Sequence, residues 1–331
     1  MKKQSRLLLG AVIMGLLISL PTFKAPSPVS AQSKTQVRFV TLSPGSGSYQ
    51  SAAAIVAVIN RHSNKLRLTL TPTGGFVQAM NLVQRGEAEI GQIQTWAFEG
   101  MKTGKGEVWT GLPPFPEARA MFLIDKNIMH FVVRKDSGIK SVRDLKGKRI
   151  AQDSPAYSSH YTNKTFLNAL GYDYSKDLDI KEGSINERHT WFKEGKIDGF
   201  LQNSFPGAAV FKDLTSEMSV LFLETPQTAI DKMNQVYGPG SILPDTIKAG
   251  LYKDLNADVK SWSVVVGPVT AVRVPEDVVY EMVKLFFENQ QEAATLYARA
   301  AEATPELATQ KVTIEHHPGA LKYFKEKGWI K

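Results

Sequence analysis

The chain has 331 residues, of which 43% are hydrophobic and 22% are charged, a composition typical of soluble globular proteins and a length sufficient for two lobes. It contains no cysteine, which excludes a disulfide framework, a thiol nucleophile and a lipidated cysteine. The formal net charge of +8 includes four cations and no acid in residues 1–31, so the remainder carries 8 − 4 = +4, and the absence of a concentrated basic run argues against nucleic-acid binding.

The first 31 residues have the pattern of a secretory signal peptide. Lys2, Lys3 and Arg6 precede an apolar run over residues 7–20, and Val29-Ser-Ala31 offers small residues for cleavage near Ala31. No later segment reaches the roughly 18 continuous apolar residues that a membrane span needs. We therefore expect export to the periplasm and a mature chain without stable membrane insertion.

The first part of the mature sequence repeats a strand, a small-residue turn and a helix three times. The predicted strands are residues 36–42, 66–71 and 88–94, and the predicted helices are residues 53–60, 76–85 and a short one from Thr95 to about Gly100. This alternation predicts a parallel α/β sheet, in which ligands bind outside the carboxyl ends of the strands. The Gly- and Pro-rich residues 104–116 are predicted to form a surface loop.

The middle of the chain continues this pattern around residues 138–171. Ser141 and Gly147 are predicted to bound a short helix, and Ser158 or Ser159 to cap the helix that runs to Leu170. The other predicted strands are residues 119–124, 128–134, 149–152, 178–181, 196–203 and a buried one within 260–274. The other predicted helices are residues 185–194, much of 225–259 with breaks at Pro239 and Pro244, a long one with Pro275 in its first turn, and 320–327.

These elements predict an α/β fold of two lobes, each with a mixed, mostly parallel sheet flanked by helices. We expect residues 32–128 and 268–331 to form the first lobe and residues 129–267 the second.

The predicted turns at strand ends carry hydroxyls, amides, glycines and aromatic rings, which together can recognise a carboxylate without a buried charge pair. The candidate ligand-binding residues are Ser46, Gly47, Ser48, Tyr49, Thr73, Gly74, Gly75, Phe76, Gln94, Thr95, Trp96, Ser154, Tyr157, Ser158, Ser159, His160, Asn203, Ser204 and Phe205. Among them, Gly74, Gly75, Ser158 and Ser159 are expected to hold the carboxylate. The alternative is that the glycines only make turns and the aromatics fill the core.

Catalytic patterns are absent from the sequence. The six histidines have no metal-ligand spacing, and neither a nucleophile elbow nor a dinucleotide or phosphate-loop fingerprint occurs. We therefore expect no enzyme activity, no metal and no cofactor, with His160 as the histidine most worth testing.

A series of motifs runs through the mature chain in a recognisable order: Tyr49 after a Gly/Ser turn, Pro72–Gly75, Arg85–Ile90, Arg134–Ile139, Leu145–Arg149, Gly195–Asp198 and His317–Tyr323. This order resembles the TAXI-type solute receptors of TRAP transporters. The resemblance implies a type II periplasmic binding protein fold, closing on its ligand like a flytrap. It also implies a small organic acid as ligand, glutamate or 2-oxoglutarate for example, and delivery to a TRAP-type integral membrane permease driven by an ion gradient.

The sequence departs from that family's pattern at Gln50 and Tyr157, in the turns that should meet the ligand, so we expect a ligand other than glutamate. The alternatives are a substrate-binding protein of an ATP-driven importer, an enzyme on the same scaffold, and a sensor or chaperone outside transport.

Overall fold

The computed structural model describes residues 33–42, 44, 46–155, 157–253 and 255–331. Every helix and strand discussed below belongs to the unit formed by residues 34–331. The signal peptide predicted over residues 1–31 lies outside the described residues. No helix in the described part is both long and apolar enough to cross a membrane.

The first parallel group of strands places β1 between β2 and β3, as the alternation of strands and helices predicts. Its elements are β1 (Thr35–Thr41), α1 (Gly47–His62), β2 (Leu66–Pro72), α2 (Phe76–Gln84), β3 (Ile90–Gln94), a short 3-10 turn η1 (Thr95–Ala97) and α3 (Phe98–Thr103). Helix α3 continues beyond the predicted end at Gly100 and stops at Gly104, whose positive φ of 70° suits glycine.

The second parallel group places β6 between β7 and β8. Its elements are β6 (Arg149–Asp153), α4 (Ser158–Ala169), β7 (Asp179–Gly183), α5 (Ile185–Lys193), β8 (Gly199–Ser204) and α6 (Ala209–Glu217). The short helix predicted after Ser141 is a turn instead, because the Asp144 carboxylate accepts the backbone N–H groups of Lys140 and Ser141. The prediction that Ser158 or Ser159 caps α4 is also wrong, since Tyr157 is the N-cap and makes no side-chain cap.

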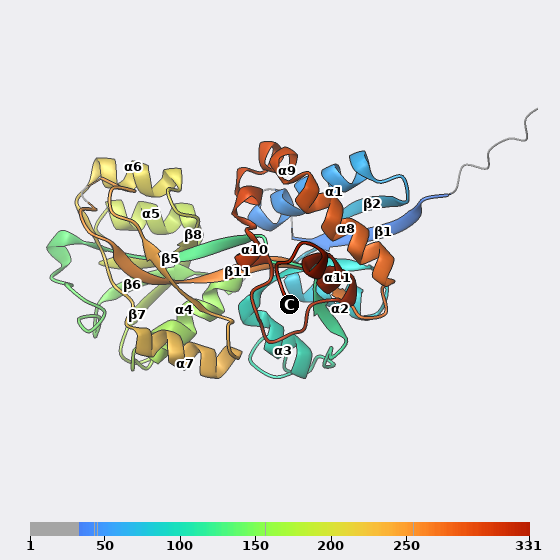
Figure 1. Cartoon of the computed structure of the whole chain (residues 1–331). Helices are drawn as coiled ribbons and strands as arrows, with labels where there is room; N and C mark the ends of the chain where they lie inside the picture. The colour runs from blue at the N-terminus through green and yellow to red at the C-terminus, as the bar shows by residue number, and fades with distance from the viewer. Residues whose placement is uncertain (1–32, 43, 45, 156, 254) are drawn as a thin grey trace, which may run out of the picture. The chain divides into compact units, whose positions relative to one another are not determined.

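The strands β5 (Asp125–Arg134) and β11 (Val259–Ala271) join the two parallel groups into one sheet with the order β2-β1-β3-β11-β5-β8-β6-β7. Short strands β4 (Ala118–Ala120), β9 (Val220–Phe222) and β10 (Leu243–Ile247) pair beside them. We call the part built on β1–β3 the first lobe and the part built on β6–β8 the second lobe (Figure 1). The predicted lobe boundaries at residues 128/129 and 267/268 fall within β5 and β11.

The prediction is poorest between residues 225 and 259. Helix α7 (Gln227–Tyr237) is present, but β10 follows it where further helix was predicted. Pro244 does not exclude a strand here, because β10 pairs only with β11 among the described strands and a sheet edge tolerates a residue without an N–H.

The C-terminal helices return to the first lobe. They are α8 (Glu276–Glu288), α9 (Gln290–Leu296), η3 (Ala298–Glu302), α10 (Pro305–Ala308) and α11 (Pro318–Glu326), and Figure 1 shows α8 and α9 beside α1. Pro275 is the N-cap of α8 rather than a residue of its first turn. A Cβ on Gly319 would lie 2.3 Å from the carbonyl oxygen of Glu276, so glycine allows α11 to approach α8 closely.

The second lobe has a core that contains a neutral histidine. His130 on β5 is fully buried, stacks on Phe211 with ring centroids 4.1 Å apart, and lies 2.8 Å from the hydroxyl of Tyr252. Burial lowers the pKa of His130 to about 4, because a charged imidazole would lose its hydration.

This shift makes the stability of the protein depend on pH. The unfolded chain takes up the proton near pH 6.5, so the stability is fully present above that pH and is lost as the pH falls from 6.5 towards 4. In urea unfolding, His130→Gln should reduce the loss of unfolding free energy between pH 7 and pH 5 by about 2 kcal/mol. An unchanged pH dependence would contradict a neutral His130 in the folded state.

Candidate functional site

The register of the long strands brings the carboxyl ends of the two parallel groups to face each other. Gln94 at the end of β3 pairs with Val266 of β11, and Ser204 at the end of β8 pairs with Ile128 of β5. Ile128 in turn pairs with Ser263, three residues from Val266, which corresponds to roughly 10 Å along a strand. Because β3 and β8 run in opposite directions, their ends meet near the middle of the sheet, where ligands of open α/β sheets bind.

A small cavity of about 20 Å³ lies at this meeting point. Its lining includes Ser48 near the N-terminus of α1, Phe76 at the N-terminus of α2 and Ser158 at the N-terminus of α4. Helix N-termini carry free N–H groups and a partial positive charge, which favour an anion. Among the described residues, those that line the cavity carry no charged side chain. The attraction for an anion here would therefore come from the backbone of both lobes.

A hydrogen bond from Ser158 connects the second lobe to the first across the cavity. The hydroxyl of Ser158 donates to Oε1 of Gln94 at 3.1 Å, and the indole N–H of Trp96 donates to the same oxygen at 2.9 Å. Gln92 is fully buried in the wall, where its amide nitrogen donates to Ser51 at 2.7 Å. Its Oε1 has no hydrogen-bond partner within the described residues, so this polar atom remains available to a water or a ligand group.

The structure brings together only part of the predicted site. The cavity-lining residues among the candidates are Ser48, Phe76, Gln94, Trp96 and Ser158. Several others already serve the backbone: Ser46 caps α1, Thr73 donates to the carbonyl of Thr41, the N–H of Gly74 donates to Gln78, and Thr95 donates to the carbonyl of Ser241. Gly47, Tyr49, Gly75 and Ser154 lie in the same turns without lining the cavity.

The remaining candidates lie in the second lobe, away from the cavity lining. Tyr157 is 46% exposed at the start of α4, and Asn203 and Ser204 end β8. Phe205 is 43% exposed, and the guanidinium of Arg299 from the first lobe stands 5.4 Å from its ring centroid. Their role in ligand binding stays a prediction.

A buried ion pair holds the turn that presents Ser158. Arg188 on α5 is fully buried and pairs with Asp153 at the end of β6, and it also donates to the carbonyl of Leu201 on β8. Ser159 donates to the second carboxylate oxygen of Asp153 at 2.6 Å, and it is not among the residues that line the cavity. Burial raises the pKa of Asp153 and lowers that of Arg188, and the opposite charge of each partner counters the shift.

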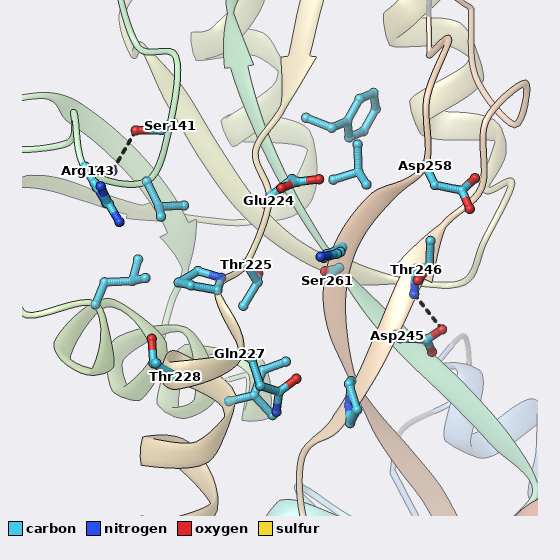
Figure 2. Close-up of a pocket in the computed structure, with 18 of the residues that line it drawn as sticks. Ser141, Arg143, Glu224, Thr225, Gln227, Thr228, Asp245, Thr246, Asp258 and Ser261 are labelled. Atoms are coloured by element: carbon cyan, nitrogen blue, oxygen red, sulfur yellow. Dashed lines mark hydrogen bonds between the residues drawn. The ribbon is translucent and has the colours of Figure 1, made fainter.

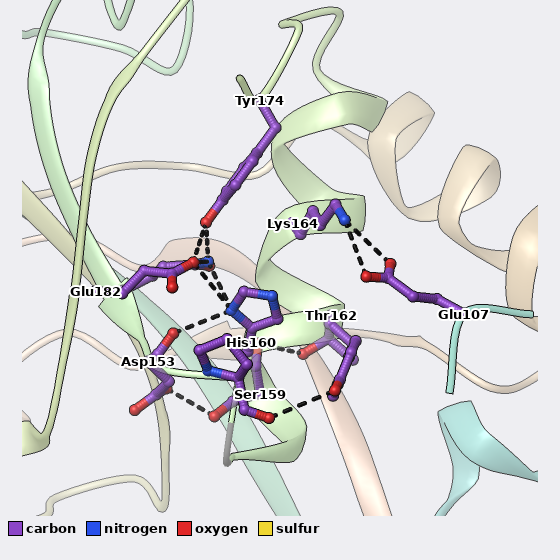
Figure 3. A network of polar contacts seen from close by, with 11 residues as sticks. Glu107, Asp153, Ser159, His160, Thr162, Lys164, Tyr174 and Glu182 are labelled. Carbon is purple, nitrogen blue, oxygen red and sulfur yellow. Dashed lines mark hydrogen bonds and ion pairs between the residues drawn. The ribbon is translucent and has the colours of Figure 1, made fainter. Parts of the chain in front are cut away.

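His160 belongs to a polar network inside the second lobe (Figure 3). Its Nδ1 lies 3.2 Å from Oε1 of Glu182 and 3.1 Å from Nε2 of Gln152, and the hydroxyl of Tyr174 donates to Glu182 at 2.8 Å. The ring is 6% exposed and does not line the cavity. Through these contacts with Glu182 and Gln152, His160 holds the first turn of α4 against β6 and β7.

Sequence reasoning missed residues that border the cleft. Gln92 is a polar residue within a buried apolar strand, and that contrast could have marked it. Trp109 is only 4% exposed although residues 104–116 are predicted as a surface loop, because the loop folds its indole onto α3 at Gly100. Tyr161 and Tyr237 contact Trp96 through tertiary packing that no local pattern indicates.

A larger hollow, of about 990 Å³, lies elsewhere and contains none of the candidate residues (Figure 2). It is lined by residues around 140–143 and 224–228 and by the first part of β11, with side chains of both charges such as Arg143 and Asp258. It does not lie at the carboxyl ends of the parallel strands. Across the described residues, no cluster of three or more His, Asp or Glu side chains is arranged to hold a metal ion.

The fold is two-lobed and of the periplasmic binding protein type, as the sequence analysis expects. A family model described as the NMT1-like family matches residues 39–328, and the chain belongs to this family.

Solved structures with this fold include three bacterial proteins. A TctC solute-binding protein from Polaromonas, without ligand, is 11% identical with a TM-score of 0.53, over 80% of this chain and 88% of that one. A protein from Xanthomonas citri bound to ATP is 12% identical with a TM-score of 0.51, over 88% and 94%. A periplasmic sulfonate-binding protein, SsuA, of a putative sulfonate ABC transporter from Methylobacillus flagellatus is 13% identical with a TM-score of 0.50, over 84% and 74%.

The Asp153–Arg188 pair yields a stability prediction. Arg188→Met leaves a carboxylate buried without its partner, which should lower the unfolding free energy by about 3–5 kcal/mol. Lys176→Met, which removes the exposed partner of Asp173, is the matched control and should leave the unfolding curve unchanged. Equal urea midpoints for the two variants would contradict the structural role of the buried pair.

Proposed function

We propose that the chain is an extracytoplasmic solute-binding protein that captures a small organic anion between its lobes and delivers it to a membrane importer. The observation that carries the proposal is the meeting of the N-termini of α1, α2 and α4 at one interlobe cavity without a charged side chain in its described lining. A carboxylate or sulfonate there would receive backbone N–H groups from both lobes. An anion that contacts both lobes favours the state in which they meet, through its differential affinity.

We further propose that the importer is ATP-driven. This proposal is supported by membership of the NMT1-like family and by the fold shared with a sulfonate-binding protein of a putative ABC transporter. The TRAP permease implied by the motif resemblance is the alternative. An extracytoplasmic receptor also requires export, which agrees with the periplasmic location expected from the first 31 residues.

Binding should be detectable as thermal stabilisation of the exported, processed protein. A carboxylate or sulfonate at 1,000 times its dissociation constant adds about 4 kcal/mol, enough to raise the Tm by several degrees. Ser158→Ala should weaken the binding of that anion by about 1–3 kcal/mol, measured by titration calorimetry, because the Ser158 hydroxyl would donate to the anionic group. Ser216→Ala, an exposed serine on α6, should bind like the parent protein. Unchanged affinity in Ser158→Ala would contradict this placement of the anion.

The energy source can be tested with the same ligand in cells that carry this chain and its own importer. If the importer is ATP-driven, uptake continues when an ionophore collapses the ion gradients while cellular ATP is kept constant. Uptake that stops with the gradients would contradict the ATP-driven importer and support the TRAP permease.

A further inference from the structure

A second, larger space lies beside the small cavity. It measures about 520 Å³, within the range of small-molecule sites, whereas the small cavity, at about 20 Å³, accommodates one water. An anion can therefore enter the small cavity only if the lobes part there and the Ser158–Gln94 hydrogen bond is replaced. Trp96 borders both spaces. The larger one lies between α3 with residues 105–109 on the first lobe and α4 with α7 on the other side, and we call it the aromatic chamber.

The walls of the aromatic chamber are formed by rings from both sides of the cleft. Trp96 stacks on Tyr161 of α4 with centroids 6.0 Å apart, and it meets Tyr237 of α7 edge-on at 5.4 Å. Phe76, which lines the small cavity, stands edge-on to Trp96 at 5.6 Å and to Trp109 at 6.1 Å. Aromatic rings therefore run without interruption from the helix N-termini into the chamber.

Polar contacts orient part of this wall, and the charged side chains that line the chamber are Glu99, Lys105 and Glu107. The hydroxyl of Tyr237 lies 2.7 Å from that of Thr165 and donates to the backbone carbonyl of Tyr161, which orients the Tyr237 ring. Lys164 of α4 pairs with both carboxylate oxygens of Glu107, at 3.1 Å each, across the rim (Figure 3). Since this Glu is already neutralised by a Lys, the pair presents no net charge to an occupant.

We propose that the aromatic chamber receives a planar aromatic group of the ligand, while the anionic end of the same molecule lies at the N-termini of α1, α2 and α4. The inference rests on the proposed function and adds a ligand class, the aromatic carboxylates or sulfonates. Flat rings fit walls of Trp and Tyr, because offset and edge-on ring contacts contribute beyond the area they bury. Trp96 lines both the small cavity and the aromatic chamber, so such a molecule would contact Trp96 with both of its ends.

The test compares acids that share a carboxylate but differ in their tail. Calorimetric titrations with propionate, 3-phenylpropionate and 3-cyclohexylpropionate separate the anionic end, a flat ring and a bulky ring of similar size. We expect 3-phenylpropionate to bind at least tenfold more tightly than either of the others. Ethanesulfonate and 2-phenylethanesulfonate repeat the comparison for a sulfonate head.

Variants connect this preference to the chamber. Val236 lies on α7, lines the aromatic chamber and is 64% exposed, so Val236→Trp should narrow the chamber. This variant should lower the ratio of 3-phenylpropionate to propionate affinity at least tenfold. Leu296→Trp, at a 53% exposed position on α9, is the matched control and should keep the ratio. Tm values equal to that of the parent protein show that both variants fold.

The outcomes separate a failure of the chamber proposal from a failure of the proposed anion-binding function. If propionate and 3-phenylpropionate bind equally, or if Val236→Trp keeps the preference, the chamber is not used and anion capture still stands. If none of the five acids binds to the parent protein, the anion site fails and the chamber proposal fails with it.

Discussion

The opposed directions of β3 and β8 are the constraint on which the site depends. Strand β11 is antiparallel to β3, and β5 is antiparallel to both β11 and β8, so the two parallel groups end toward each other. Each parallel strand that leads into a helix leaves that helix N-terminus at the same edge. The long strands β5 and β11 therefore connect the lobes and also bring the helix N-termini of both lobes to the small cavity.

The lining of the small cavity carries no charged side chain, whereas the buried Asp153–Arg188 ion pair supports the turn beside it. If the Arg188 guanidinium lined the cavity, it would lose its hydration each time a ligand bound. Removing a charged group from water in this way is costly. In the structure its charge is permanently paired with Asp153, and this pair fixes β6, α5 and the turn before Ser158. In the proposed site, the ligand would meet groups that need no counter-ion, Ser158 and Gln94 among them. Such groups can hold an anion and still release it.

Local sequence patterns predict the repeating part of this fold because its signals are local. Alternation in residues 66–71 and the turn at Pro72–Gly75 both depend on neighbours in the chain, and β2 and α2 appear there. The edge strand β10 has no comparable signal, since its pairing with β11 is a tertiary event and Pro244 reads locally as a break. The site divides in the same way: Ser158 follows a recognisable turn, whereas Tyr237 reaches Trp96 only because α7 packs on α4.

The contacts across the cleft set a limit on what a ligand must supply. The Ser158–Gln94 hydrogen bond and the contacts of Trp96 with Tyr161 and Tyr237 contribute about 0.5–1.5 kcal/mol each, so these contacts stabilise the meeting of the lobes only modestly. A ligand that replaced the hydrogen bond without adding contacts to both lobes would change this balance little, since only differential affinity shifts a conformational equilibrium. Under the proposed function, an anion seated between α1, α2 and α4 would gain N–H groups that face each other only when the lobes meet. That added affinity would allow the protein to signal occupancy to the proposed membrane importer.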